Sequence, residues 1–154
     1  RMHGYGVRHF ASGTSYHGEY VNGLRHGSGK TIFPNGDVYE GEYYNDKMDG
    51  HGKYLHSKVG ECYEGTFRNG KKHGVGKYQM RDGSLDVVQY KEDKRVGEGV
   101  RYSKNRRRSW KLIMNGQKQG KRVSLEEAHV IAERCTKEAS LKDDIIMKKR
   151  SAMI

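Results

Sequence analysis

The sequence repeats itself along most of its length with a period of about 23 residues. The repeat is marked by the first glycine of a recurrent Gly-x-Gly pair, which falls at Gly4, Gly27, Gly50, Gly74, Gly97 and Gly120. The successive spacings are 23, 23, 24, 23 and 23 residues. A period this short and this regular corresponds to one supersecondary unit copied along the chain. The sequence therefore predicts a repeat architecture rather than a closed globular domain.

Each unit carries a Tyr-x-Gly-x-Tyr string, seen most clearly as Tyr39-Glu40-Gly41-Glu42-Tyr43. In a β-strand, alternate residues share one face, so the two rings and the glycine project together. The glycine leaves a slot into which we expect a neighbouring unit to place an aromatic ring. Turn-forming residues follow at Gly23, Asp46, Gly70, Asp93 and Gly116. A second strand then begins at the Gly-x-Gly pair, so each unit is predicted to be a β-hairpin that is stable only when stacked.

The complete motif, Tyr-x-Gly-x-Tyr-x-x-Gly-x-x-His-Gly-x-Gly, resembles the MORN repeat (membrane occupation and recognition nexus) over about residues 3–122. The predicted units are 1–15 (partial), 16–38, 39–62, 63–85, 86–108 and 109–122 (degenerate), followed by a helical segment at 123–154. In the fifth unit Asp86 and Val88 stand where the tyrosine and the glycine belong. We interpret this change as the decay expected of terminal units, which lack a neighbour to pack against.

The composition agrees with an elongated array. Only 33% of the 154 residues are hydrophobic and the mean hydropathy is −1.03, values that disfavour a large compact core. A stack of hairpins needs only a thin aromatic ridge, which 11 tyrosines and 3 phenylalanines can supply. The predicted fold is mainly β: an elongated array of antiparallel β-hairpins forming one twisted, groove-like sheet, with a C-terminal α-helix.

The chain is strongly basic, with 30 Lys and Arg against 19 Asp and Glu and a formal charge of +11, which indicates an acidic partner surface. Between Ser103 and Arg122 the cations stand without an acidic residue among them: Lys104, Arg106, Arg107, Arg108, Lys111, Lys118, Lys121 and Arg122. This run is either a solvated face or a patch for an anionic partner. Trp110, inside the run, is either an anchor for a partner or a replacement for the missing repeat tyrosine.

The period changes from strand to helix after Val123. Ser124-Leu125-Glu126-Glu127 has the form of a capping box and predicts a helix over about 125–138. Its apolar stripe comprises Leu125, Ala128, Ala132, Cys135 and Ala139, widened by Val130 and Ile131. Ser140 and Asp143 could begin a second helix through about Arg150. The first helix either caps the last hairpin or docks on another chain.

The two cysteines, Cys62 and Cys135, make no metal or redox spacing and are predicted to be free thiols in a reducing compartment. No apolar run of about 18 residues and no signal-peptide pattern occurs, so the sequence predicts no segment that spans a membrane. The sequence begins at Arg1 inside a repeat, and we expect further repeats upstream in a longer protein.

Three patterns imitate catalytic or binding motifs without meeting their requirements. Residues 27–31 look like the end of a phosphate-binding P-loop, but Leu24 stands where that loop needs glycine and the segment starts a strand. The repeated histidines occur once per hairpin without a second ligand type, so hydrogen-bonding roles are predicted for His3, His26 and His73. The repeated glutamates are predicted surface features: Glu19, Glu40, Glu42 and Glu64. The sequence thus predicts no catalytic residue, metal site or cofactor.

The first functional hypothesis is a non-catalytic scaffold or adaptor that binds protein partners in a large cytoskeletal or membrane-associated assembly. Bound peptides would lie along the sheet, with the second aromatics of the units as stacking positions: Tyr20, Tyr43, Phe67 and Tyr90. The family resemblance implies cytoplasmic, cytoskeletal settings such as ciliary radial spokes or the cell cortex, and membrane junctions.

The alternative hypothesis is a module that binds anionic phospholipid through the basic run. MORN arrays also occur as appendages of lipid kinases and of a protein-lysine methyltransferase, so the resemblance leaves open a catalytic domain outside this chain. Nucleic acid is a weaker reading, because the aromatics belong to the packing face. The sheet edges allow the chain to associate with itself as a dimer or filament.

Overall fold

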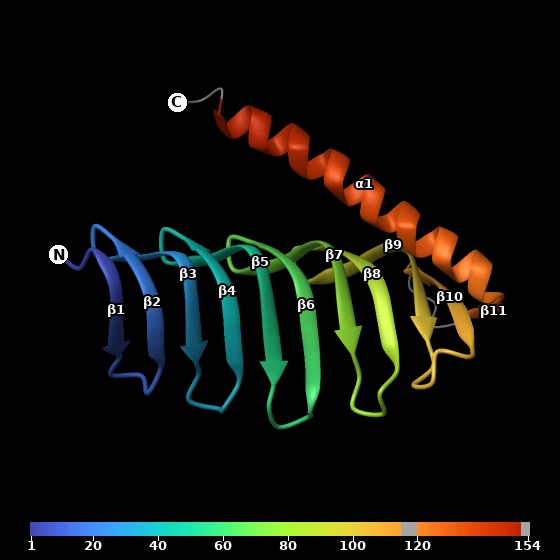
Figure 1. Cartoon of the computed structure of the whole chain (residues 1–154), viewed down its shortest axis with the longest axis horizontal. Coiled ribbons are helices and arrows are strands. Elements are labelled where there is room, and N and C mark those ends of the chain that lie inside the picture. The colour runs from blue at the N-terminus through green and yellow to red at the C-terminus, as the bar shows by residue number, and fades with distance from the viewer. Residues whose placement is uncertain (115–119, 152–154) are drawn as a thin grey trace.

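Eleven antiparallel strands form one open sheet, and every strand pairs with the strands that precede and follow it in the sequence (Figure 1). The computed structural model describes residues 1–114 and 120–151. Its elements are β1 (Gly4–His9), β2 (Ser15–Val21), β3 (Leu24–Ile32), β4 (Val38–Tyr44), β5 (Lys47–His56), β6 (Glu61–Arg68), β7 (Lys71–Gln79), β8 (Leu85–Lys91), β9 (Lys94–Tyr102), β10 (Ser109–Met114), β11 (Lys121–Val123) and α1 (Leu125–Ser151). The predicted fold class is confirmed.

Tight two-residue turns join β2 to β3, β4 to β5, β6 to β7 and β8 to β9. The turn between β2 and β3 places Asn22 and Gly23 at φ values of 53° and 86°, and the turn between β4 and β5 places Asn45 and Asp46 at 45° and 68°. Positive φ at both central positions gives the turn whose twist matches antiparallel strands. The predicted turns at Gly70 and Asp93 have the same backbone, whereas Gly116 lies outside the described residues.

A bulge follows the repeat glycine in three hairpins, for example between Gly41 and Tyr43, and follows Val88 in the hairpin of β8 and β9. It leaves backbone amides of the second strand without a ladder partner, and the repeat glutamates accept from them. Glu19 Oε1 accepts from the Ser28 amide at 3.1 Å, and Glu42 accepts from the His51 amide. Glu19 and Glu42 therefore stabilise the backbone of their own hairpins. Thr66 and Gln89 occupy the same position in the next two units.

The tyrosine that opens each unit lies across a pair of facing glycines. Gly41 is paired with Gly52 in the register of β4 and β5, and Tyr39 covers both of them. A Cβ at Gly41 would stand 2.5 Å from the Cα of Gly52, so no side chain fits there. The Tyr39 hydroxyl donates to the Glu42 carbonyl at 2.9 Å. The ring over the glycine slot thus comes from the same unit, whereas we expected a ring from a neighbouring unit.

Adjacent units are joined by edge-to-face contacts between these rings. Tyr39 contacts Tyr43 of its own unit with centroids 5.3 Å apart, and Phe67 of the next unit at 5.0 Å. The same pattern links Tyr16 to Tyr43 at 5.1 Å and Tyr63 to Tyr90 at 5.2 Å. The rings form one continuous core on a single face of the sheet. We call this side the aromatic face.

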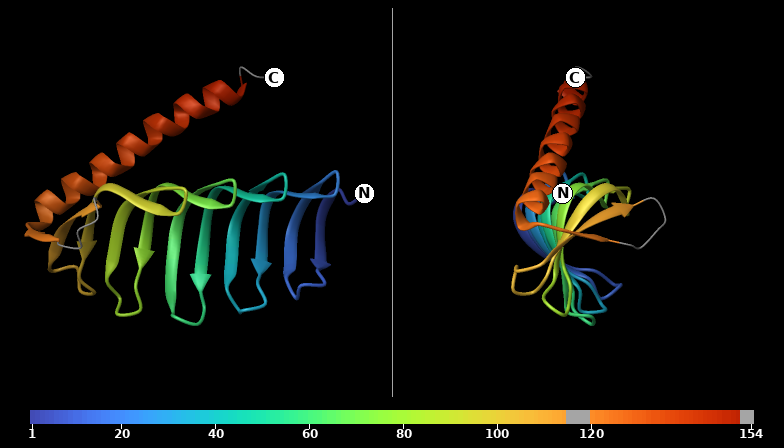
Figure 2. Two further views of the ribbon diagram at one scale, coloured as in Figure 1. Left: turned by 180° about the vertical axis from the view of Figure 1, so that it is seen from behind. Right: turned by 90° about the vertical axis from the view of Figure 1, so that its right-hand side faces the viewer.

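The opposite side of the sheet carries α1, and we call it the helix face. α1 contacts β7, β8, β9 and β10, and its later turns diverge from the sheet (Figures 1 and 2). It is one continuous helix to Ser151, where the sequence suggested a break near Ser140. Ser124 Oγ accepts from the Glu127 amide at 3.1 Å, as the capping box predicts.

Candidate functional site

The aromatic face does not offer ring surfaces to a partner. Tyr20, Tyr43, Phe67 and Tyr90, which were predicted to be stacking positions, are only 1%, 3%, 5% and 4% exposed. Their planes are already occupied by the tyrosines of the same and the neighbouring unit. The prediction was wrong because the rings pack against one another rather than standing open in a groove.

Long side chains cover this ridge from the second strand of each unit. Arg25 lies over the rings of Tyr16 and Tyr43, at 5.7 and 5.0 Å, and Lys72 lies over those of Tyr63 and Tyr90, at 5.0 and 5.7 Å. Burial lowers the pKa of the Lys72 ammonium. Cation–π contact of this kind stabilises the ridge and closes it to solvent. The sequence signal was available, because these cations recur at one position of the repeat.

Tyrosine hydroxyls at the margin of the ridge are held by acidic side chains. Tyr54 Oη donates to Asp37 Oδ2 at 3.1 Å, and Tyr78 Oη donates to Glu61 Oε2 at 2.5 Å. Burial, reinforced by the bond to Asp37, raises the pKa of Tyr54 to about 12. Burial opposes the ionisation of Asp37, but the hydrogen bonds from Ser57, Asn35 and Tyr54 outweigh it and leave its pKa lowered. These acids are engaged in structural bonds.

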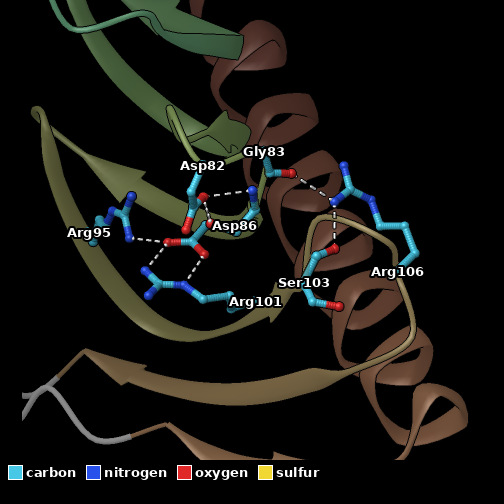
Figure 3. A network of polar contacts seen from close by, with 8 residues as sticks. Asp82, Gly83, Asp86, Arg95, Arg101, Ser103 and Arg106 are labelled. Atoms are coloured by element: carbon cyan, nitrogen blue, oxygen red, sulfur yellow. Dashed lines mark hydrogen bonds and ion pairs between the residues drawn. The ribbon is translucent and has the colours of Figure 1, made fainter.

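In the fifth unit, a buried carboxylate bound by two arginines takes the place of the repeat tyrosine (Figure 3). Asp86 is fully buried and receives Arg101 through two bonds, Nε to Oδ1 at 2.7 Å and Nη2 to Oδ2 at 2.9 Å. Arg95 Nη1 adds a third bond to Oδ2 at 2.6 Å. Val88 is also fully buried and joins the aromatic core. The fifth unit therefore has a packed core of its own. The interpretation of Asp86 and Val88 as terminal decay was wrong, because the two substitutions compensate one another.

Trp110 takes the place of a repeat tyrosine, one of the two alternatives that the sequence left open. The register pairs Asp86 with Arg101, and Arg101 with Trp110. Trp110 therefore lies in the same transverse row as Tyr39 and Tyr63, on the aromatic face.

The structure divides the predicted basic run into separate groups. Lys104, Arg106, Arg107 and Arg108 are exposed on the loop between β9 and β10. Arg106 Nη1 donates to the carbonyls of Gly83 and Ser103, at 3.1 and 2.8 Å, and so ties this loop to the preceding one (Figure 3). The side chains of Arg107 and Arg108 make no ion pair with any residue that the structure describes. Within this loop, these two arginines and Lys104 are the cations that remain available to an anion.

The remaining members of the run lie elsewhere. Lys111 Nζ forms an ion pair with Glu98 Oε1 at 2.8 Å, although the sequence shows no acidic residue in the run. The register places Lys111 opposite Lys121 on the helix face, whereas Arg122 is opposite Trp110 and faces the other way. Lys118 lies outside the described residues. Of the predicted patch, Lys111 is therefore paired with an acid, and Arg122 does not share a surface with Lys111 and Lys121.

α1 packs on the helix face where the fifth unit carries valines in place of charged residues. Val87 and Val100, paired across β8 and β9, pack against Ala128, Ile131 and Cys135, which are all buried. The predicted stripe is right for these residues and for the half-buried Ala132, but Leu125 is 47% exposed and Val130 also faces solvent. α1 covers a face rather than capping the end of the sheet.

Polar contacts hold the first half of α1 in this position. Arg134 Nη1 lies 3.2 Å from Glu98 Oε2, and Gln89 Nε2 donates to Glu138 at 3.1 Å. Cys135 Sγ donates to the Glu98 carbonyl at 3.3 Å. A hydrogen bond from Lys111 is the main reason why the pKa of Glu98 is lowered. Glu98 therefore connects β9, β10 and α1.

The same face is exposed over the preceding units. The register aligns a transverse row of alternating charges, all of them exposed: Lys30, Glu40, Lys53, Glu64 and Lys77. Beside it runs an apolar row of Ile32, Val38, Leu55 and Cys62, in which Ile32 and Leu55 are exposed. The charged row continues directly into Val87 and Val100. Sequence reasoning missed this surface, although the change from charge to valine at one repeat position was visible.

The histidines and cysteines have local structural surroundings. Arg68 Nη1 and His73 Nε2 are 3.0 Å apart, a hydrogen bond of the predicted kind. The His26 ring contacts the Tyr44 ring at a tilt, and its Nδ1 is buried without a hydrogen bond. Within residues 1–114 and 120–151, no group of three His, Cys, Asp or Glu side chains is placed to hold a metal ion. Cys62 and Cys135 are free. No described helix has both the length and the apolar character needed to cross a bilayer.

An open single layer of β-hairpins, with tyrosines lying over paired glycines, defines a repeat protein that is elongated rather than globular. The MORN repeat model matches residues 1–15, 16–38, 39–58, 63–85 and 89–106, more than half of the chain. The chain belongs to the MORN repeat family. Repeats of this family mediate binding to proteins or membranes. No curated protein matches the sequence.

The bounds of the family matches agree in part with those of the predicted units. Three of them have the predicted bounds, whereas the third unit ends at 58 instead of 62 and the fifth runs over 89–106 instead of 86–108. The predicted sixth unit, 109–122, has no match, although β10 and β11 continue the sheet there. The fifth match begins after Asp86 and Val88, the two residues that depart from the motif.

Proposed function

We propose that the protein is a non-catalytic scaffold or adaptor that binds protein partners within a large cytoskeletal or membrane-associated assembly. One observation carries this proposal: the helix face holds α1 across β7–β10 and stays exposed across β3–β6. A surface that binds a helix from its own chain is built to bind a second helix on its continuation. The family resemblance suggests a cytoplasmic setting such as a cilium, flagellum or cell cortex.

The exposed rows define the chemistry of such a partner. Neighbouring strands are about 4.8 Å apart and one helical turn rises about 5.4 Å, so a helix crossing the strands meets about one strand per turn. Alternating Lys and Glu along the sheet favour a helix that presents the opposite alternation at successive turns. Ile32 and Leu55, beside the charged row, would receive its apolar side chains. The partner is therefore an amphipathic helix.

The absence of catalysis is part of the proposal. The buried acids have structural partners, since Asp86 is held by Arg95 and Arg101 and Asp37 by the Tyr54 hydroxyl. Glu19 and Glu42 accept hydrogen bonds from backbone amides of their own hairpins. These engagements leave the same groups unsuited to proton transfer to a substrate.

Site-specific photo-crosslinking in a native extract tests the proposal. A photoreactive residue at Leu55, on the helix face, should capture a protein whose cross-linked segment is an amphipathic helix. The matched control is Val59, which is similarly exposed but lies in the loop between β5 and β6. Capture should fall sharply when Ile32→Asp is added to the Leu55 probe. Equal capture from both positions, or none from Leu55, would contradict the scaffold proposal.

A second candidate function is binding to anionic phospholipid, and the loop cations favour it. Lys104, Arg107 and Arg108 are exposed together on one loop. Each cation near an anionic membrane contributes about 1 kcal/mol, less as salt rises. Sedimentation with phosphatidylserine vesicles should show binding that Lys104→Ala/Arg107→Ala/Arg108→Ala removes. Binding that vanishes at physiological salt in the parent chain would reduce this candidate to nonspecific charge.

A further inference from the structure

A buried serine follows the basic loop between β9 and β10 and links α1 to the sheet. Residues 106–110 read Arg-Arg-Arg-Ser-Trp, so Ser109 follows three arginines. Ser109 is 1% exposed, and its hydroxyl donates to the carbonyls of Val123 and Ser124 at 3.1 and 3.3 Å. Ser124 is the residue that caps α1. One hydroxyl thus connects β10, the end of β11 and the start of the helix.

The strand that covers this serine is the weakest part of the sheet. β11 has three residues, pairs only with β10 and forms one edge of the described sheet. Short edge strands open locally at much lower cost than central strands. Opening of β11 exposes Ser109 behind Arg107 and Arg108, whose side chains are already in solvent. The segment 106–110 is then an extended peptide with its cations on the N-terminal side of a hydroxyl.

We propose that Ser109 is a phosphorylation site for an arginine-directed serine kinase, and that its modification releases α1 from the helix face. Such kinases bind the basic residues before the serine with acidic subsites. The Ser109 oxygen attacks the γ-phosphorus of ATP, the bond from that phosphorus to the β–γ bridging oxygen breaks, and ADP leaves. The hydroxyl proton passes to the catalytic base of the kinase.

The modified serine cannot return to its place in the closed structure. Its oxygen no longer has a proton to donate, and a group of about two negative charges would face the Val123 and Ser124 carbonyls in a site with no free space. In the open state, the phosphate can instead bind Arg107 and Arg108. The modification therefore favours the open state of β11 and disturbs the first turn of α1.

Release of α1 has a direct reporter in the chain. Cys135 is buried between α1 and β9, and its thiol becomes accessible only when the helix lifts. The release also uncovers Val87 and Val100, the apolar continuation of the exposed helix face. The switch stands on the Ser109 contacts alone and does not depend on the partner proposed above.

The test uses the full chain with Cys62→Ser, which leaves Cys135 as the single thiol. Ser151→Ala is added because Ser151 also follows three cations. The catalytic subunit of cAMP-dependent protein kinase, with Mg-ATP, serves as the probe. Tandem mass spectrometry should locate phosphate on Ser109, and the modified protein should react with N-ethylmaleimide at Cys135 at least tenfold faster.

Two further variants make the result decisive. Arg107→Ala/Arg108→Ala should abolish phosphate at Ser109 and leave Cys135 slow to react. Ile131→Asp places a charge in the buried contact between α1 and the sheet and should release the helix. If opening of β11 limits the access of the kinase to Ser109, this variant should be phosphorylated several-fold faster. Lack of phosphate at Ser109 in the parent chain overturns the site. Phosphate at Ser109 with unchanged Cys135 reactivity, or no acceleration by Ile131→Asp, overturns the switch.

Discussion

The units before β8 and the unit formed by β8 and β9 share one backbone register but fill it with different side chains. In the earlier units a tyrosine lies over two glycines, and the other face carries alternating charges. In the later unit Asp86 and Val88 replace the ring and its glycine, while Val87 and Val100 replace the charges. Both faces change together where α1 binds. Departure from a repeat motif can therefore mark a unit with a specialised role.

The largest effect on stability should come from removing an aromatic ring from one of the units before β8. Tyr39→Ala empties a fully buried site that contacts both Tyr43 and Phe67, and we expect a loss of about 3–5 kcal/mol of unfolding free energy. Urea denaturation measures it. Tyr44→Ala, on the same strand but exposed, is the control and should change stability by less than about 0.5 kcal/mol. A loss below about 1 kcal/mol for Tyr39→Ala would show that the ridge is not the core.

Restoring the motif in the fifth unit tests whether its two substitutions depend on each other. Asp86→Tyr alone should destabilise by about 2 kcal/mol or more, because the ring meets Val88 and two arginines lose their carboxylate. Asp86→Tyr/Val88→Gly should recover part of that loss. A double-mutant cycle from denaturant melts should give a coupling of about 1 kcal/mol or more. Strict additivity would mean that the two positions are independent.

A smaller, pH-dependent effect should appear at the attachment of α1. Glu98 has a lowered pKa because of the hydrogen bond from Lys111, so its contribution is complete above its unfolded pKa, near 4.5, and is lost as pH falls through the lower folded value. Hydrogen exchange around Cys135, corrected for intrinsic rates, should show less protection at acid pH.

Glu98→Gln provides the control for this titration. The variant should show weakened protection of α1 near neutral pH and a flatter dependence on pH, since the ion pairs with Lys111 and Arg134 are already lost. Protection of α1 that falls equally with pH in the parent chain and the variant would assign the effect to another group.

The smallest effect should come from the exposed charged row. Lys30 and Glu40 form an ion pair at 3.7 Å with both side chains largely in solvent. Lys30→Ala should change stability by less than about 0.5 kcal/mol, because exposed pairs contribute little. Calorimetry at low and high salt checks this value. A loss above about 1 kcal/mol would mean that the row stabilises the sheet itself, and would weaken its assignment as a docking surface.

The hairpins could be predicted because their determinants are local. Asn22-Gly23 and Asn45-Asp46 adopt positive φ through their own residue types, and the Gly-x-Gly period places each pair of strands in register. The capping serine of α1 is equally local. In each case the causes lie within a few residues of the structure they produce.

The buried ion pairs and the true role of the aromatics could not be predicted in the same way. Asp86 finds its partners nine and fifteen residues later in the sequence, so the loss of tyrosine was visible while its compensation was not. The second aromatic of each unit looked available because a single-layer sheet has two open sides. The structure covers those rings with other tyrosines and with the guanidinium of Arg25 and the ammonium of Lys72, a packing set by neighbouring units together.

The order of the strands has a kinetic consequence. Since each strand pairs with its sequence neighbours, every pairing between the described strands closes a loop shorter than one repeat. Sheet proteins usually fold slowly because distant segments must meet first, a delay that depends on contact order. The β-hairpin array should therefore fold at rates typical of proteins with local contacts. Under mechanical pulling from its ends it should lengthen hairpin by hairpin.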